Sequence, residues 1–226
     1  FLDGLPRPVD PAESDGLSND NALPVNHSSR GGALIDALGL PDGVIAAEIV
    51  GEDPTARLLP EEQVLLDELD PRPELDIRRR EILYGREAAR RAIVRAGVAE
   101  RPLLPQGAGV APRRPVWPEG LVGSLSHLNC YDLADRGYYI AVAADARHVR
   151  ALGIDAERPV PLGDILRNRI ARSEELGWLD RIGAYRDIPW DRVLFSAKES
   201  VYKAWSPLTD RYLGFEDVSV TFYPDE

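Results

Sequence analysis

The sequence WDRVLFSAKESVYKAW, residues 190–205, is the stretch that decides how this chain folds. Its apolar side chains recur at helical spacing, which predicts one helix over Trp190–Trp205 with a core-facing stripe. The stripe consists of Leu194, Ala197, Val201 and Ala204. Glu199 and Lys203 lie one turn apart on a neighbouring face. They are either an ordinary helical ion pair, worth about 0.2–0.5 kcal/mol, or two groups of an active site.

Lysine is almost absent from the chain. Lys and Arg together number 27, yet Lys198 and Lys203 are the only lysines, and both fall in this helix. Lysine carries a compact point charge, whereas the arginine fork is planar and stays charged. A phosphoryl-transfer site uses a carboxylate that binds metal or accepts a proton, and an ammonium that neutralises phosphate charge. The two lysines beside Glu199 therefore favour such a site over chance clustering.

The segments outside this helix mix strands and helices without a regular alternation, which predicts an α+β fold. Apolar and alternating runs predict strands at Val44–Val50, Leu121–Ser126, Tyr139–Ala144, Leu152–Ala156 and Val218–Tyr223. Periodicity and helix-start signals predict helices at Pro60–Leu69, Pro73–Ala96 and Arg167–Arg172. Two halves, each with strands and a major helix, would meet near His148.

This organisation divides the chain into three parts. Residues 1–30 are rich in Asp, Asn, Ser, Pro and Gly, which predicts a disordered tail or a cloning remnant. We expect an N-terminal α+β half over 31–148 and a C-terminal α+β half over 149–226. A Pro- and Gly-rich loop is expected from Pro102 to Pro118.

Composition excludes several classes of protein. The hydrophobic content of 44% is enough for a core, and no apolar run approaches the roughly 20 residues of a membrane span. Cys130 is the only cysteine, so a disulfide scaffold within the chain is excluded and a reducing compartment fits. The net charge of -11 argues against a general nucleic-acid binder. These features predict a soluble, cytoplasmic protein.

The sequence GIDAE, residues 153–157, places two carboxylates two positions apart. On a strand such residues project from the same face, so Asp155 and Glu157 can reach one hard cation. An Mg²⁺ site needs only a couple of carboxylates, because substrate phosphates and water complete the octahedron. The simpler alternative is a solvated strand end with Glu157 paired to Arg158.

The sequence GSLSH, residues 123–127, lacks the final glycine of a hydrolase nucleophile turn, because His127 stands there. A catalytic triad of Ser126, His127 and Asp132 is unconvincing, since such close neighbours seldom converge. At a strand end among small polar residues, His127 suits contact with an anionic ligand. The alternative is a partly exposed structural histidine.

The helix predicted at Pro73–Ala96 carries many basic side chains outside its apolar stripe. They are Arg78, Arg79, Arg80, Arg86, Arg90, Arg91 and Arg95. Three interpretations stay open. The face is solvated and softened by Glu81, Glu87 and Glu100, or it is a nucleic-acid stripe that the net acidity disfavours. In the third, one or two arginines clamp a phosphate, for which the guanidinium fork is well matched.

Taken in order and at these separations, GSLSH, GIDAE and FSAKESVYKAW resemble the phosphopantetheinyl transferase superfamily. Within it the chain is similar to the surfactin-type group, and especially to the enterobactin synthetase transferase branch. The resemblance runs from about Val44 to Phe222. Further matches are Gly85-Arg86, Trp117-Pro118, Trp190-Asp191 and Ser206-Pro207-Leu208-Thr209 before Gly214-Phe215-Glu216-Asp217.

The resemblance implies a fold and an activity. The fold would be a pseudo-symmetric pair of α+β halves with coenzyme A in the cleft between them. The enzyme would move the 4'-phosphopantetheine arm of coenzyme A onto a serine of an acyl or peptidyl carrier protein, releasing 3',5'-ADP. We expect a monomer that binds neither nucleic acid nor membrane.

The resemblance also implies site residues. Asp155, Glu157 and Glu199 would surround Mg²⁺, which holds the coenzyme A pyrophosphate, and Glu199 would be the base for the carrier serine, directly or through water. Lys203 would stabilise the pyrophosphate as the bond to the leaving 3',5'-ADP breaks. The expected contacts with the phosphates of the coenzyme come from Ser126 and His127 at its 3'-phosphate end, and from Arg78, Arg86 and Lys198.

Two departures from the family pattern stand out. Related sequences carry a lysine in the loop before Trp117-Pro118, where this chain has Gln106 among small residues and Arg113 and Arg114 further on. The family would also continue with strand sequence after Glu226. Two other functions therefore stay open: a coenzyme A-binding interaction protein without turnover, and an RNA or DNA binder that uses the arginine-rich helix.

Overall fold

The computed structural model describes residues 35, 38–69, 76–105, 114–128, 137–183 and 185–223. They belong to one compact unit, Ala33–Glu226. The predicted tail at 1–30 and the loop around Gln106 lie outside the described residues.

Strands and helices are mixed, which confirms the α+β class. The strands are β1 (Ile45–Val50), β2 (Leu121–Leu128) and β3 (Tyr138–Asp145). The helices are α1 (Val64–Asp67), α2 (Asp76–Arg95), α3 (Asp164–Ile170), α4 (Ser173–Ile182) and α5 (Trp190–Thr209). Short 3-10 turns are η3 (Pro60–Glu62), η5 (Tyr185–Asp187) and η6 (Phe215–Asp217). Three predicted strands and all the predicted helices are present with shifted ends, and α4 was not predicted.

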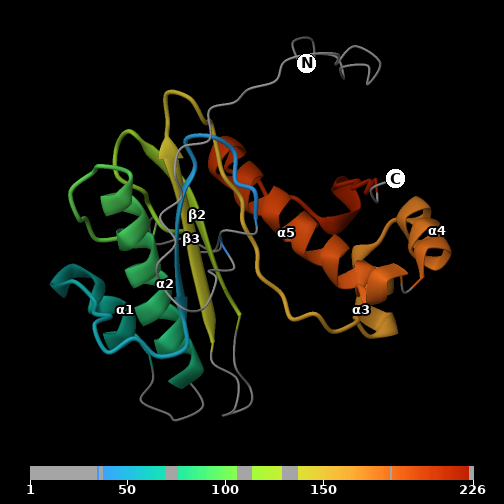
Figure 1. The fold of residues 1–226 in the computed structure, drawn as a ribbon, viewed down its shortest axis with the longest axis horizontal. Helices are drawn as coiled ribbons and strands as arrows, with labels where there is room; N and C mark the ends of the chain where they lie inside the picture. Colours follow the sequence, from blue (N-terminus) through green and yellow to red (C-terminus); the bar gives the residue numbers. More distant parts are fainter. Residues whose placement is uncertain are drawn as a thin grey trace, which may run out of the picture. The chain divides into compact units, whose positions relative to one another are not determined.

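The sheet has the order β1-β3-β2, with both pairs antiparallel. Helix α2 covers one face of it, and α5 lies on the other side (Figure 1). Small residues let α2 approach closely: Ala47, Ala88 and Ala141 are fully buried in the core between them. A Cβ on Gly85 of α2 would touch Leu125 of β2 at 3.8 Å, so Leu125 faces this helix.

On the opposite face of β2 lie the alternate residues Ser124 and Ser126, which are buried. The predicted strand at Leu152–Ala156 runs against them but does not join the sheet. The Ile154 N–H donates to the Ser124 hydroxyl at 3.1 Å, and the Ala156 N–H donates to the Ser126 hydroxyl at 3.2 Å. The strand prediction is therefore wrong, because side-chain oxygens take the place of the carbonyls that a neighbouring strand would offer.

The predicted strand at Val218–Tyr223 is also absent. The Val220 N–H donates to a Glu175 carboxylate oxygen at 2.8 Å instead of to a strand. Within the described part of 149–226, the regular elements are helices and turns only. The predicted similarity of the two halves is thus not confirmed.

Helix α5 continues past its predicted end at Trp205 to Thr209, although Pro207 removes the N–H that would bond to the Lys203 carbonyl. Arg114 supports this last turn from outside. One guanidinium nitrogen donates to the Ser206 carbonyl at 2.6 Å, and another pairs with Asp210 at 2.8 Å. Arg114 therefore caps the C-terminal end of α5.

The core of the C-terminal region surrounds a buried ion pair. The Lys198 ammonium, 1% exposed, donates to Glu175 at 2.6 Å and to the carbonyls of Ile170 and Phe215 at 2.8 and 2.9 Å. Glu175 also accepts the N–H of Val220. One pair therefore joins α5 to the end of α3, to α4 and to the C-terminal segment.

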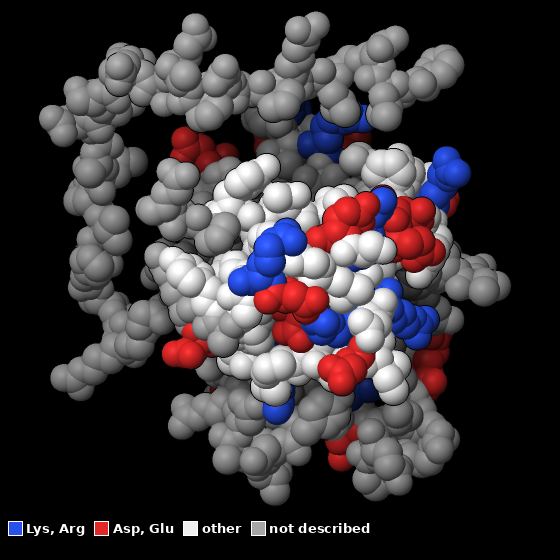
Figure 2. Space-filling model, turned by 90° about the vertical axis from the view of Figure 1, so that its right-hand side faces the viewer, with Lys and Arg blue, Asp and Glu red and all other residues white. Residues whose placement is uncertain are grey.

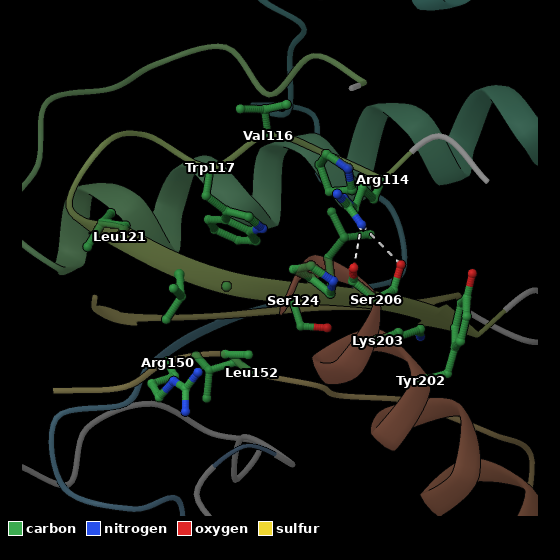
Figure 3. A pocket seen from close by; sticks show the side chains of 16 residues that line it. Arg114, Val116, Trp117, Leu121, Ser124, Arg150, Leu152, Tyr202, Lys203 and Ser206 are labelled. Atoms are coloured by element: carbon green, nitrogen blue, oxygen red, sulfur yellow. Dashed lines mark hydrogen bonds between the residues drawn. The ribbon is translucent and has the colours of Figure 1, made fainter. Parts of the chain in front are cut away.

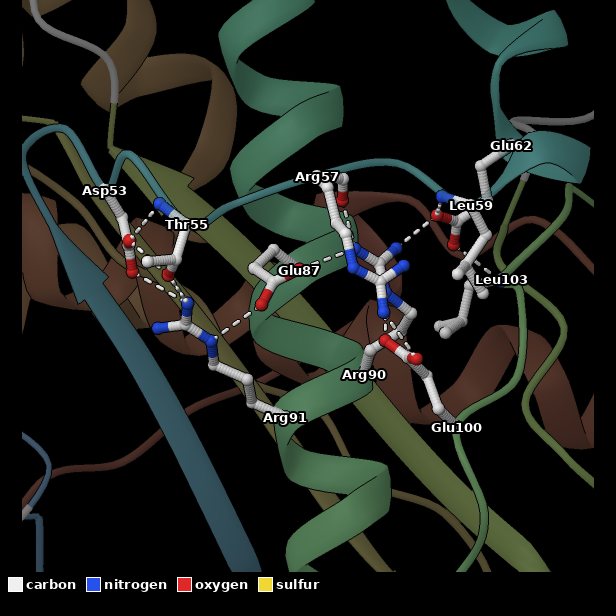
Figure 4. Close-up of polar contacts among 10 residues, drawn as sticks. All are labelled: Asp53, Thr55, Arg57, Leu59, Glu62, Glu87, Arg90, Arg91, Glu100 and Leu103. Atoms are coloured by element: carbon white, nitrogen blue, oxygen red, sulfur yellow. Dashed lines mark hydrogen bonds and ion pairs between the residues drawn. The ribbon is translucent and has the colours of Figure 1, made fainter.

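A second buried network fixes α2 to the segment that follows β1 (Figure 4). The Arg90 guanidinium is 1% exposed and contacts Glu62, Glu87 and Glu100, as well as the Arg57 carbonyl. Glu62 is fully buried and accepts further backbone N–H groups from Leu59 and Leu103. Arg90 of α2 is therefore structural, and at this position the helix is not a solvated face.

We expect Lys198→Met to lower the free energy of unfolding by about 3–5 kcal/mol, because Glu175 would keep a buried charge without its cation. At about 2–4 °C per kcal/mol for this chain length, the melting temperature should fall by roughly 10 °C. The double variant Lys198→Met/Glu175→Gln keeps an acceptor for the N–H groups but removes the unpaired charge, so it should recover part of the loss. A melting temperature of Lys198→Met equal to that of the wild type would contradict this role.

Candidate functional site

The site is built where β2, the segment 151–158 and α5 meet at one ammonium. The Lys203 Nζ donates to an Asp155 carboxylate oxygen at 2.7 Å, to the Ser126 hydroxyl at 3.1 Å and to the Ile154 carbonyl at 3.0 Å. The Ser126 hydroxyl in turn donates to Asp155 at 3.0 Å. Three elements distant in sequence are thereby held at one point.

This junction forms one wall of a polar pocket with a volume of about 790 Å³. Seven of the predicted site residues line it: Arg78, Arg86, Ser126, His127, Asp155, Glu157 and Lys203. Two others do not, Lys198 and Glu199. The ammonium of Lys198 is enclosed in the C-terminal core with all three of its N–H groups used, which disagrees with the prediction that it contacts phosphate.

The three predicted metal ligands influence one another electrostatically. Burial raises the pKa of Glu157, the Asp155 charge raises it further, and Arg192 opposes both. Burial also raises the pKa of Glu199, followed by the charge of Asp155, while Lys203 lowers it. The Oδ2 atom of Asp155 is buried and has no hydrogen-bond partner within the described residues. Mutual repulsion and an unsatisfied oxygen are what a cation would relieve.

The acids do not form a ready-made metal centre. Among the residues that the structure describes, no group of three or more His, Cys, Asp or Glu has that geometry. Cations of the chain hold two of them instead: Lys203 pairs with Asp155, and Arg192 donates to Glu157 at 3.0 Å. The alternative pairing of Glu157 with Arg158 is thus replaced by one with Arg192.

Sequence reasoning missed Arg192. It stands in the first turn of α5, where its Nε also donates to the Val160 carbonyl at 3.0 Å. Its neighbour Asp191 accepts the Leu162 N–H at 2.8 Å. This turn therefore holds the chain that follows Glu157. The only signal in the sequence was the Trp190-Asp191 pair directly before it.

Cationic side chains also line the wall of this pocket. Burial lowers the pKa of the Arg86 guanidinium to about 10, which still leaves it charged at neutral pH, and its Nε has no hydrogen-bond partner in the described part of the chain. His127 is partly buried beside Glu81, with 3.6 Å between Nδ1 and Oε1. Glu81 accepts from Arg78 at 2.8 Å. Such a wall suits a phosphate.

An apolar cavity of about 500 Å³ adjoins the polar pocket. Trp117 and Leu152 lie on opposite sides of it, with Tyr202 of α5 at one end (Figure 3). The two spaces share Pro115, Leu125 and Lys203 as lining residues. A ligand with a charged part and an uncharged arm could therefore occupy both.

The described surface shows no continuous basic patch on the face that carries α3 and α4. Lys and Arg side chains alternate there with Asp and Glu (Figure 2). Within the described residues, no helix combines the length and the apolar character needed to cross a membrane.

Comparisons with known families define the class of this protein. Residues 73–144 match the family described as the 4'-phosphopantetheinyl transferase N-terminal domain, and residues 151–226 match the 4'-phosphopantetheinyl transferase superfamily. The chain belongs to the 4'-phosphopantetheinyl transferase superfamily, as its motifs predicted.

Individual relatives agree with this membership. The chain is 41% identical over 175 residues to the 4'-phosphopantetheinyl transferase Svp of Streptomyces mobaraensis, a match that covers 77% of the chain and 65% of Svp. It is 39% identical to the 4'-phosphopantetheinyl transferase PptT of Mycobacterium tuberculosis over 79% of the chain and 71% of PptT. Enterobactin synthase component D of Salmonella typhi is 36% identical over 64% of the chain and 55% of that protein, in line with the predicted branch.

We expect Gly153→Ala to disturb the junction, because a Cβ there would collide with the Ser200 carbonyl oxygen of α5. Backbone cannot yield as a flexible side chain can, so the segment 151–158 must shift, at a cost of about 1–3 kcal/mol. Differential scanning calorimetry should show a melting temperature lower by several degrees. Gly163→Ala is the matched control, since nothing lies within 4 Å of its added methyl group. Equal melting temperatures for the two variants would show that the close approach is not needed.

Proposed function

We propose that this chain transfers the 4'-phosphopantetheine arm of coenzyme A to a serine of an acyl or peptidyl carrier protein, releasing 3',5'-ADP. The observation that carries the proposal is the polar pocket, which sets cationic side chains beside acidic ones. Membership of the transferase superfamily supports it.

The proposal assigns each part of coenzyme A to a part of the site. The 3'-phosphate would contact Arg78, Arg86 and His127 by charge-assisted hydrogen bonds. The pyrophosphate would lie near Lys203, and the uncharged pantetheine arm would enter the apolar cavity beside Trp117. Arg78 and His127 come from the N-terminal half and Lys203 from the C-terminal half, which supports a ligand bound between 31–148 and 149–226.

Asp155, Glu157 and Glu199 would hold Mg²⁺ in this proposal. The residues fit the ion, because hard oxygen ligands are what it prefers and because Asp155 has an unsatisfied oxygen. When bound, the ion would neutralise charge on the pyrophosphate.

The chain's own residues have distinct roles in the proposed reaction. The carrier serine oxygen forms a bond to the phosphorus that bears the pantetheine, and the bond from that phosphorus to the oxygen of the leaving 3',5'-ADP breaks. Glu199, whose raised pKa makes it a better proton acceptor than an ordinary carboxylate, would take the serine proton directly or through water. Lys203 would stabilise the charge that develops on the pyrophosphate. The nucleophile belongs to the carrier, so the chain needs none of its own.

Incubation with an apo carrier domain, coenzyme A and Mg²⁺ tests the proposal. We expect the carrier to gain the mass of one phosphopantetheine group, and Asp155→Asn to lower the rate at least about 100-fold at a temperature where circular dichroism shows that both proteins are folded. Coenzyme A binding without any mass gain would instead favour an interaction protein that has lost turnover. Wild-type rates for Asp155→Asn would remove the metal assignment.

Lys203→Arg separates a catalytic lysine from a surface ion pair. Arginine keeps the charge, but its wider fork does not place a compact ammonium against the pyrophosphate and the Ser126 hydroxyl. We therefore expect kcat to fall by at least about tenfold, while the melting temperature changes by no more than a few degrees. Near-normal turnover of Lys203→Arg would show that this lysine has a structural role only.

A further inference from the structure

Glu81 is a buried acid on the wall of a pocket that suits an anion. Only 9% of the residue is exposed, and it lines the polar pocket together with Arg78, Arg86 and His127. Asp155 and Glu157 also line this pocket, and the proposed function gives them a cation. Glu81 lies outside that set. A carboxylate in its position would repel a phosphate, so its presence requires a compensating role.

Its two oxygens face two different cationic side chains. Oε2 accepts from the Arg78 guanidinium at 2.8 Å, one turn earlier on α2. Oε1 lies 3.6 Å from the Nδ1 atom of His127 on β2. That nitrogen makes no hydrogen bond within the described residues, so Glu81 is the acid placed to attract it.

The charges around His127 make this contact important. Burial lowers the pKa of the ring, the nearby charges of Arg78 and Lys203 lower it further, and those of Glu81 and Asp155 raise it. Glu81 is the strongest of the influences that favour the protonated ring. A protonated ring has an N–H donor on both nitrogens, whereas a neutral ring has only one. The protonated ring therefore binds a phosphate better.

We propose that Glu81 is a positioning residue that holds His127 and Arg78 as a pair, so that both present donors to the terminal phosphate of the ligand. The inference rests on the proposed function, because it takes that phosphate to be the 3'-phosphate of coenzyme A. Glu81 does not touch the ligand itself. It acts by fixing two side chains that belong to different elements, α2 and β2.

Glu81→Gln tests this role, because it keeps the shape of the side chain and removes its charge. By calorimetry at acidic pH, where His127 is protonated, we expect the affinity for coenzyme A to fall about tenfold, the size of one lost charge-assisted hydrogen bond. The affinity for 3'-dephospho-coenzyme A should change less than about twofold. Glu48→Gln is the control: it removes a half-buried acid of β1 that accepts from the Tyr138 hydroxyl outside the pocket, so it should leave both affinities unchanged.

The pH dependence provides a second readout. In the wild type, the preference for coenzyme A over 3'-dephospho-coenzyme A should fall as the pH rises through the pKa of His127, because the ring then loses the positive charge that attracts the 3'-phosphate. Removing Glu81 lowers that pKa, so in Glu81→Gln the fall should begin at lower pH. A merely structural acid would leave this midpoint unchanged, and an unchanged midpoint overturns the inference.

Other outcomes are equally decisive. A gain in coenzyme A affinity in Glu81→Gln would show that the acid only repels phosphate, and equal losses for both ligands would show a general effect on the pocket. Either result would overturn the role of Glu81. The proposed phosphate contact would still be supported if the wild type binds coenzyme A more tightly than 3'-dephospho-coenzyme A. A wild type without that preference would overturn both. If Glu81→Gln does not fold, Glu81→Asp, which retracts the charge, should show the same ligand-specific loss at smaller size.

Discussion

The structure depends on how one ammonium, that of Lys203, is surrounded. Its three acceptors come from β2 and from the segment 151–158, while the lysine itself belongs to α5. Burying this ammonium is costly unless acceptors and an opposite charge surround it, and Asp155 supplies that charge. The layers therefore have one low-energy arrangement, and in it Asp155 stands on the pocket wall.

The close approach of these layers follows from small residues. Ser124 and Ser126 present hydroxyls where a sheet facing a second layer usually presents aliphatic groups, and they bind the N–H groups of the segment directly. Gly153 then lets the segment touch the backbone of α5. Bulkier side chains at these positions would separate sheet and helix, and Lys203 could no longer span the gap. The GSLSH and GIDAE motifs thus describe packing as well as chemistry.

The sequence predicted four of the five α-helices and the three strands of the sheet, because periodicity is a local property, and the resemblance to a known family predicted most of the charged residues that line the pocket. It could not predict which residues form hydrogen bonds and ion pairs with one another in the folded chain. The pattern at Leu152–Ala156 predicts a strand, but in the folded chain its N–H groups donate to serine hydroxyls instead of to a neighbouring strand. Lys198 fitted a phosphate-binding motif by position, but burial beside Glu175 is a tertiary fact. Arg192 and Glu81 lay in charged helical turns that resemble any solvated surface.

The arginine-rich helix shows how one residue type acquires two functions. Arg90 meets Glu62, Glu87 and Glu100 and becomes part of the core, whereas Arg86 faces the pocket with its Nε unpaired in the described part of the chain. The two arginines are one turn apart, so they lie on the same side of α2. Fixing Arg90 in a buried network of acids consequently fixes the height of Arg86 on the pocket wall. The buried ion pairs therefore serve the site by holding in register a cation that they do not touch.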